Sequence, residues 1–313
     1  MNFTVGLSQI KYDFTDCIIK NKNRIDEVYF SYPGIQNGRM TQEALSDKPL
    51  FEQLNFVHES LKVLSDSGLK LNLLLNATCY GKDSLSRAFF EKTGNCTDGL
   101  LSSFNLTSVT TASPIIAKFI KNNFKSLEVR ASVNMEIGTT ESMDYIKNYY
   151  DSFYVRRELN RDFNALKTLK KWADENEKKL FGLANSGCLN YCSAHVFHDN
   201  LVSHEKEIAA MDNAYEFTGI CREYLKSDEN YASLYDKMNF IRPEDVCMYE
   251  PFFESLKLAT RVHNHPSYVL ESYINQKYSG DLLKLLEPEH SIYPYVIENG
   301  NPPMLKNILN SGR

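Results

Sequence analysis

Short apolar runs of strand length alternate along this chain with longer stretches whose apolar residues recur at helical spacing. Helices are expected over residues 51–67, 114–122 and 160–176, and in the first of these Leu54, Val57, Leu61 and Leu64 form one apolar face. Strands are expected at eight places: residues 27–31, 71–76, 108–111, 127–134, 152–156, 180–185, 239–242 and 255–260.

Eight strand–helix alternations in a chain of 313 residues are typical of a (β/α)8 barrel of the TIM type. We therefore predict an α/β fold in which residues 1–313 form a single barrel domain. The pattern leaves room for a barrel that is irregular or open near its last strands. Insertions that carry cysteines are expected at about residues 186–250.

Composition narrows the class of protein. The apolar share of 42% is enough for a large core, and the formal net charge of −5 gives no reason to expect nucleic acid as a partner. No stretch approaches the roughly 18 apolar residues of a membrane helix, and the N-terminus lacks the features of a signal peptide. Seven cysteines, an odd number, without an export signal indicate a cytoplasmic protein in which structural disulfides are rare.

Two cations lie inside apolar strand patterns, Arg130 and Lys257, and two more follow strands, Arg157 and Arg261. A cation is costly to bury unless an anion meets it, and chemistry on a barrel collects at the C-terminal ends of its strands. We therefore assign these four residues to the binding of carboxylate groups in the reaction centre. The alternative is a buried ion pair, for which Glu27, Glu128 and Asp245 are the candidates.

Polar residues at the same strand ends are candidates for substrate contact, namely Asn76, Asn134 and Asn185. His195 and His198 follow the first cysteine pair closely. Histidine can ligate a metal, transfer a proton or donate a hydrogen bond. We place His198 in the reaction centre and His195 at the substrate.

Four cysteines in the second half of the chain suggest a metal centre: Cys188, Cys192, Cys221 and Cys247. Four thiolates can complete the coordination of a zinc ion or of a four-iron cluster. Only the first two form a close pair, so the other two must be brought in by the tertiary fold. Buried free thiols are the alternative, because reduced cysteine is among the residues most often buried. The spacing alone leaves both interpretations open.

Several other chemistries have no sequence support. The chain contains no G-x-x-x-x-G-K-[ST] loop, no G-x-G-x-x-G turn and no H-E-x-x-H helix. It also lacks the G-x-S-x-G turn of serine hydrolases. Position 195 is a histidine, so Cys188 and Cys192 do not begin a C-x3-C-x2-C motif.

The segments around the later cysteines resemble those of the collagenase-like peptidase family U-32. They are Cys221-Arg222-Glu223-Tyr224, Glu244-Asp245-Val246-Cys247 and the strand pattern Leu256–Arg261. The resemblance covers residues 180–278 well, whereas the N-terminal half matches only as a barrel of the right size. It implies that the four cysteines hold a 4Fe-4S cluster, with zinc as the alternative, and that Lys257 and Arg261 face a carboxylate-bearing ligand.

The resemblance also implies an activity. The better-understood members of the family look like iron–sulfur proteins that hydroxylate without oxygen gas, in ubiquinone biosynthesis or on RNA bases. This chain departs from them at Ala259-Thr260 and at Ala184–Gly187, which indicates a different substrate.

The hypothesis is therefore an oxygen-independent hydroxylase or related redox enzyme acting on a small-molecule or peptide substrate. The alternatives are a metal-dependent peptidase, or a non-catalytic cluster-binding partner of a paralogous enzyme.

Overall fold

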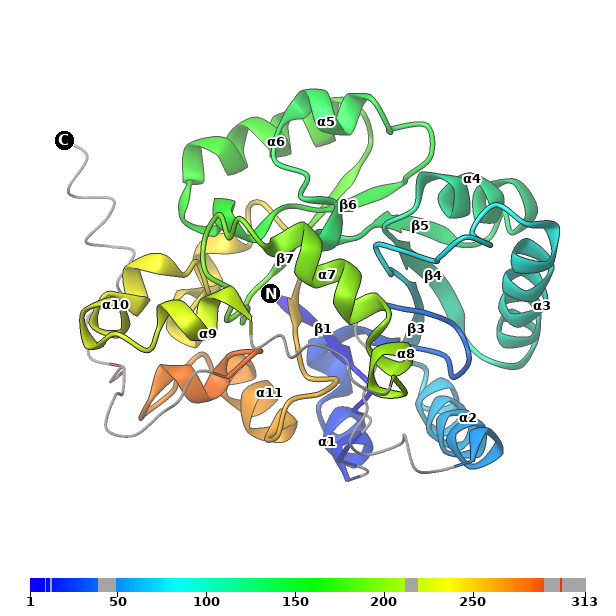
Figure 1. Ribbon diagram of the computed structural model, residues 1–313, viewed down its shortest axis with the longest axis horizontal. Helices are drawn as coiled ribbons and strands as arrows, with labels where there is room; N and C mark the ends of the chain where they lie inside the picture. Colours follow the sequence, from blue (N-terminus) through cyan, green and yellow to red (C-terminus); the bar gives the residue numbers. More distant parts are fainter. Residues whose placement is uncertain (9, 12, 39–48, 212–218, 290–298, 300–313) are drawn as a thin grey trace.

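Eight parallel strands form a closed barrel in chain order (Figure 1). The computed structural model describes residues 1–8, 10–11, 13–38, 49–211, 219–289 and 299. The predicted (β/α)8 fold is confirmed. The strands are β1 (Asn2–Gly6), β2 (Ile25–Phe30), β3 (Lys70–Leu75), β4 (Leu106–Thr111), β5 (Glu128–Ala131), β6 (Ser152–Tyr154), β7 (Lys179–Leu183) and β8 (Ser255–Leu258).

Helices surround the barrel, and the three predicted from periodicity are present as α2, α4 and α6. Side chains before two of them accept hydrogen bonds from the first turn, Ser113 before α4 and Asp162 before α6, which satisfies backbone donors that a helix start leaves unpaired. The helices of the first six strand–helix units are α1 (Phe14–Lys20), α2 (Leu50–Asp66), α3 (Arg87–Ser103), α4 (Pro114–Asn123), α5 (Thr140–Asp144) and α6 (Phe163–Glu175). Those that follow are α7 (His195–Ser203), α8 (Glu205–Ala209), α9 (Ile220–Tyr224), α10 (Asp228–Ala232) and α11 (Pro266–Ile274).

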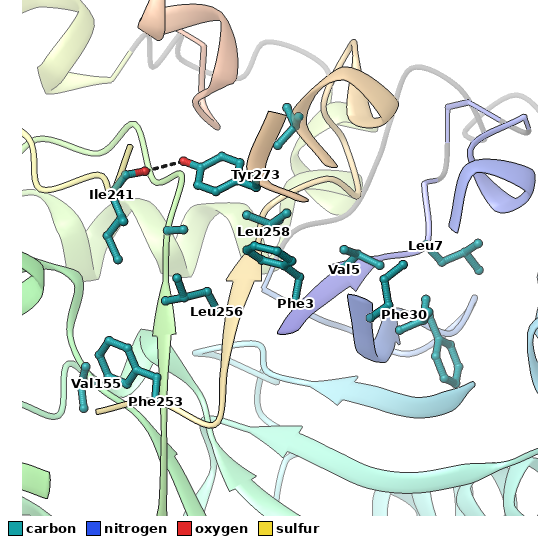
Figure 2. Close-up of a cluster of buried hydrophobic side chains, with 14 of the residues drawn as sticks. Phe3, Val5, Leu7, Phe30, Val155, Ile241, Phe253, Leu256, Leu258 and Tyr273 are labelled. Atoms are coloured by element: carbon teal, nitrogen blue, oxygen red, sulfur yellow. Dashed lines mark hydrogen bonds between the residues drawn. The ribbon is translucent and has the colours of Figure 1, made fainter. Parts of the chain in front are cut away.

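The main core lies between the barrel and its helices. Alternate strand residues such as Phe3, Val5, Leu256 and Leu258 point outward and are fully buried against them (Figure 2). Tyr273 of α11 belongs to the same cluster, and its hydroxyl donates to the backbone oxygen of Ile241 at 2.6 Å. Because the outward-facing strand residues form the apolar core, the inward-facing residues of the same strands can be polar.

The interior of the barrel is accordingly lined by hydrogen-bonded polar side chains. Asn72 donates to Ser108 at 2.6 Å, Ser108 donates to Glu27 at 2.9 Å, and Thr110 donates to Asn72 at 2.9 Å. Buried polar groups of this kind are tolerated only when their hydrogen bonds are made. The interior is therefore a specific network that can hold charge.

Two details of the strand prediction are wrong. Residues 239–242 form no strand, because β8 occupies the place beside β7 and Ile241 makes only a single ladder-like bond, to the oxygen of Ala184 at 2.7 Å. The missing member is β1, which pairs with both β2 and β8 and closes the barrel. The barrel is therefore not open near its last strands.

The connection between β7 and β8 carries all four candidate cysteines together with α7 to α10 and the short 3-10 helix η5 (Pro243–Tyr249). Figure 1 shows α7 running across the middle of the barrel. Its first residue, His195, bonds Arg157 beyond β6, and its last, Ser203, bonds Thr78 beyond β3. Helix α7 thus spans the C-terminal mouth. In the part of the chain that the structure describes, no helix is long and apolar enough to span a membrane.

Candidate functional site at the barrel mouth

Arg130 of β5 lies inside the barrel in an ion pair with two carboxylates. It contacts Glu27 directly, and its Nη2 lies 2.8 Å from Glu128 Oε1. Its Nε also donates to Ser152 at 3.2 Å, and its guanidinium carbon lies 3.8 Å from the centre of the Phe181 ring. These contacts are the buried ion pair that the sequence also allowed. The binding of a substrate carboxylate by Arg130 stays a prediction.

Lys257 of β8 is a buried cation in a different situation. Its Nζ lies 3.9 Å from the centre of the Tyr29 ring and 5.2 Å from that of Tyr154. No carboxylate among the described residues lies within ion-pair distance of it. Burial, followed by the neighbouring Arg261, lowers the pKa of Lys257 to about 7.

Arg261, at the same end of the barrel, is 7% exposed. Its Nη1 donates to Asn37 Oδ1 at 2.7 Å. Arg261 contributes to the lowered pKa of Lys257, so the two cations lie within electrostatic range of each other. The structure therefore brings two of the four predicted cations together at the mouth.

Two of the predicted substrate contacts also meet there. Asn134 Nδ2 donates to the backbone oxygen of Asn76 at 3.3 Å, and Asn76 Oδ1 accepts from the N–H of Gly38 at 3.0 Å. A Cβ at Gly38 would lie 2.7 Å from Asn134 Nδ2, so only glycine fits this close approach. Substrate contact by Asn76 and Asn134 stays a prediction.

Asn185 connects the ends of two strands. It is fully buried, and its Nδ2 donates to the backbone oxygens of Ala259 at 3.2 Å and Leu285 at 2.9 Å. Its Oδ1 accepts from the N–H of Ala259 at 2.6 Å. With both ends of the amide bonded to backbone groups, Asn185 ties the end of β7 to the end of β8. Substrate contact by Asn185 stays a prediction.

A second group of charges forms beneath the start of α7. Arg157 Nη2 lies 2.6 Å from His195 Nε2 and 3.2 Å from Glu136 Oε1. The His195 ring also lies 3.1 Å from Glu136 and 3.2 Å from Asp199. Burial alone would lower the pKa of Arg157. The interactions with Cys188 and then with Glu136 outweigh burial, so the pKa of Arg157 is raised. Arg157, His195 and the first cysteine are thus brought together.

The two carboxylates of this group differ in proton affinity. Burial raises the pKa of Glu136, but hydrogen bonds from His195 and Arg157 outweigh it and lower the pKa. For Asp199, burial prevails over the nearby His195 and raises the pKa. His198 is half-buried on α7 and lies within electrostatic range of Asp199. Its part in a reaction stays a prediction.

All seven cysteines are free thiols. The pKa of Cys221 is raised first by burial and then by Cys188 and Cys192, so these three lie within electrostatic reach of one another. Cys247 is exposed on η5. Across residues 1–8, 10–11, 13–38, 49–211, 219–289 and 299, no group of three or more His, Cys, Asp or Glu side chains is placed to hold a metal ion.

Four residues that belong to these clusters were not among the predicted site residues: Tyr29, Glu136, Tyr154 and Asp199. Asp199 follows His195 by four residues, a spacing that puts both on one face of a helix, so a signal was present. Tyr29 follows the inward-facing Glu27 by two residues, which puts both inside the barrel. Glu136 and Tyr154 have no such local signal.

Comparison with known proteins finds similarity both in sequence and in structure. No family model matches the chain. The uncharacterized protease MJ1657 of Methanocaldococcus jannaschii is 27% identical over 294 residues, which covers 90% of this chain and 81% of that protein. The U32 peptidase Mk0906 superposes with a TM-score of 0.61 at 16% identity, covering 83% of this chain and 92% of that one.

The structural similarity shows a shared barrel fold, and the sequence similarity extends over nearly the whole chain. The cysteine segments that resemble family U-32 lie within the connection from β7 to β8, beside the mouth of that barrel. The chain is therefore similar over most of its length to a protein named as a protease, and it shares its barrel fold with a U32 peptidase.

Proposed function

We propose that this protein is an iron–sulfur enzyme that acts on a carboxylate-bearing small-molecule or peptide substrate, as an oxygen-independent hydroxylase or a related redox enzyme. The observation that carries the proposal is the environment of Lys257. This residue is 8% exposed and lies near Arg261, and no carboxylate among the described residues is within ion-pair distance of its amine. An uncompensated buried cation is costly for the free protein. A carboxylate of a ligand would compensate it.

The ligand would be oriented by groups that are already fixed. Asn37 holds Arg261, and the rings of Tyr29 and Tyr154 hold the Lys257 amine in a dry environment. Ion pairs strengthen when water is excluded, so one substrate carboxylate between Lys257 and Arg261 would be bound tightly. The rest of the substrate would extend toward α7, where Arg157 and His195 lie.

Four thiols would hold the cluster: Cys188, Cys192, Cys221 and Cys247. All four are free cysteines, Cys188, Cys192 and Cys221 lie within electrostatic reach of one another, and Cys247 is exposed on η5. When bound, the cluster would supply electron transfer at the mouth. Arg157 would place a positive charge beside Cys188.

Metal analysis tests this proposal directly. Anaerobically purified protein is expected to contain about four iron atoms and a matching amount of sulfide per chain. Single Cys→Ala changes at 188, 192, 221 and 247 are each expected to lose most of the iron. Cys17→Ala is the matched control, because Cys17 lies on α1, and it is expected to retain the cluster.

One zinc per chain, or iron that survives all four Cys→Ala changes, would contradict the cluster. The carboxylate site alone would be contradicted if the cluster is present but substitutions of Lys257 or Arg261 leave the binding of dicarboxylate probes unchanged. The two parts of the proposal therefore fail separately.

A second candidate function is peptide hydrolysis. It is favoured by the name of the Methanocaldococcus jannaschii relative, an uncharacterized protease. A metal-dependent peptidase needs a metal with an open position for water. A zinc-dependent cleavage of a casein or gelatin substrate that chelators abolish would support this function over the redox reaction.

A further inference from the structure

A cavity of about 450 Å³ lies beside the mouth, away from the four candidate cluster cysteines. It is formed by the segments that follow β2 and β3 and by α8. Its lining includes Gln36, Gly81, Lys82, Lys92, His204 and Glu207. Cys79 immediately precedes two lining residues, Tyr80 and Gly81. The cavity therefore opens next to a thiol that the proposed function does not use.

Cys79 lies beside the ring of His204. Its Sγ accepts a hydrogen bond from the N–H of Gly81 at 3.5 Å, and a Cβ on Gly81 would lie 3.9 Å from Cε1 of His204, which places the imidazole next to the same turn. Gly81 has a φ of +70°, a backbone conformation that glycine adopts without strain. The interaction with His204, followed by the hydrogen bond from Gly81, lowers the pKa of the Cys79 thiol.

His204 is in turn oriented by groups on its other side. Its Nδ1 bonds the carboxylate of Glu207 one turn later, and Gln36 Nε2 lies 3.3 Å from the same nitrogen. Gln36 also donates to Glu207 at 3.4 Å. The interactions with Cys79 and then Glu207 raise the pKa of His204. A thiol, an imidazole and a carboxylate thus lie next to one another in this order, as in a thiol nucleophile with its base and the group that orients the base.

The arrangement is fixed by the residues next to it in sequence. Thr78 and Ser203, the neighbours of Cys79 and His204, bond through the N–H of Thr78 at 3.1 Å and through their hydroxyls at 3.2 Å. Ser203 is 1% exposed and also donates to the oxygen of Asp199 at 2.9 Å. These hydrogen bonds hold the segment after β3 against the end of α7. The thiol and the imidazole are therefore positioned by the fold.

We propose that Cys79 is a nucleophile activated by His204 that attacks the acyl carbon of a peptide or ester bound in this cavity. Sγ forms a bond to the acyl carbon, and the bond to the leaving amine or alcohol breaks. The imidazole gives its proton to that leaving group. Water then attacks the thioester, His204 takes a proton from the water, and the carboxylic acid and free thiol are released. Glu207 and Gln36 are positioning residues for His204.

The rate at which each cysteine is alkylated measures how strongly the Cys79 thiol is activated. Anaerobically isolated protein is treated with iodoacetamide at several pH values, and each cysteine is followed by peptide mass spectrometry. Cys79 is expected to react at least about tenfold faster than Cys17 at pH 7, because the thiolate fraction changes tenfold per pKa unit. Burial raises the pKa of Cys17, which makes it the slow reference within the same sample.

His204→Asn and Glu207→Gln are expected to remove most of this preference, and to move the pH midpoint of Cys79 alkylation upward. The other charged lining groups, Lys82, Asp83 and Lys92, are unchanged in both variants. Glu207 has an exposed side chain, so its replacement leaves folding intact even if His204→Asn does not fold. With p-nitrophenyl acetate, an initial burst of about one equivalent of p-nitrophenolate per chain, an acetyl group on Cys79 and slower turnover after the burst are expected.

Alkylation of Cys79 no faster than that of Cys17 would overturn the proposal, as would an unchanged preference in folded Glu207→Gln together with His204→Asn. An acetyl group on any residue other than Cys79 would also overturn it. Cys79→Ser is expected to keep the iron content, so failure here and failure of the cluster are told apart.

Discussion

Replacement of Arg130 by methionine is expected to lower the free energy of unfolding by about 3–5 kcal/mol. The guanidinium bonds Glu27, Glu128 and Ser152 inside the barrel, and the side chains of Arg130 and Glu27 are both 3% exposed. Without Arg130, Glu27 would be a buried charge with only the Ser108 hydroxyl to solvate it. Breaking one half of a buried pair is much more costly than removing both halves.

Urea unfolding at pH 7 measures this loss. The double variant Glu27→Gln, Arg130→Met is the matched control, and it is expected to recover a large part of the lost stability because no buried charge is left. Arg130→Lys, which keeps the charge but not the planar fork, is expected to lie between the two. A loss below about 1 kcal/mol in Arg130→Met would show that Glu27 is solvated in some other way.

Lys257→Met is expected to have the opposite sign and to stabilise the protein, on the order of 3 kcal/mol at pH 7. Both cations are buried inside the same barrel, yet only Arg130 is in contact with carboxylates. Burial lowers the pKa of Lys257 from 10.5 to about 7, so the folded protein disfavours the charged amine. Methionine has a similar shape and no charge to bury. Residues kept at the expense of stability are often functional.

The pH dependence follows from the same shift. Between pH 7 and 10.5 the unfolded chain holds a proton on Lys257 that the folded chain has released. Stability therefore rises with pH across this window, and the full penalty is present below about pH 7. Lys257→Met lacks this rise.

Urea unfolding of the wild type and of Lys257→Met at pH 6, 7.5 and 9 tests this pH dependence. The quantity to compare is the difference between the two urea midpoints at each pH. The advantage of the variant is expected to shrink toward pH 9. A variant that is less stable than the wild type at every pH would show that the amine is paired in the folded protein. The same variant is expected to lose carboxylate binding, which separates the role of Lys257 from that of Arg130.

The fold could be predicted because period-two and helical patterns are local properties of the sequence. Seven of the strands and the helices α2, α4 and α6 follow from them. Within residues 239–242, Phe240 and Ile241 resemble a strand because they are apolar, but they are buried by packing against the ends of other elements. Pairing partners are set by tertiary structure, so a buried apolar run does not reveal whether it joins the sheet.

The candidate site was predicted in part for a similar reason. That Lys257 and Arg261 lie on one strand end follows from their spacing, whereas the contact of Arg130 with Glu27 of β2 depends on closure of the barrel. Asn185 is polar at a strand end but is used entirely by backbone groups. Position along a strand predicts where a side chain lies, and only the surrounding elements decide whether its bonds are already made.

The thiol of Cys79 has no local signal of activity at all. Cys79 and His204 are more than a hundred positions apart in the sequence, and they meet because α7 crosses the mouth and ends beside the segment that follows β3. The bond between Thr78 and Ser203 belongs to the same crossing. A contact that depends on a helix inserted between β7 and β8 cannot be read from a spacing rule.

Closure of the barrel by β1 and β8 also constrains how the chain folds during synthesis. Residues 2–5 pair with residues 255–258, so the last joint of the sheet forms between segments at opposite ends of the strand order. Until β8 has left the ribosome, β1 and β7 both present unpaired edges on which other chains can add. Contacts of such long sequence separation form slowly. A nascent chain of this protein therefore has a long interval in which chaperones, rather than its own fold, must protect it from aggregation.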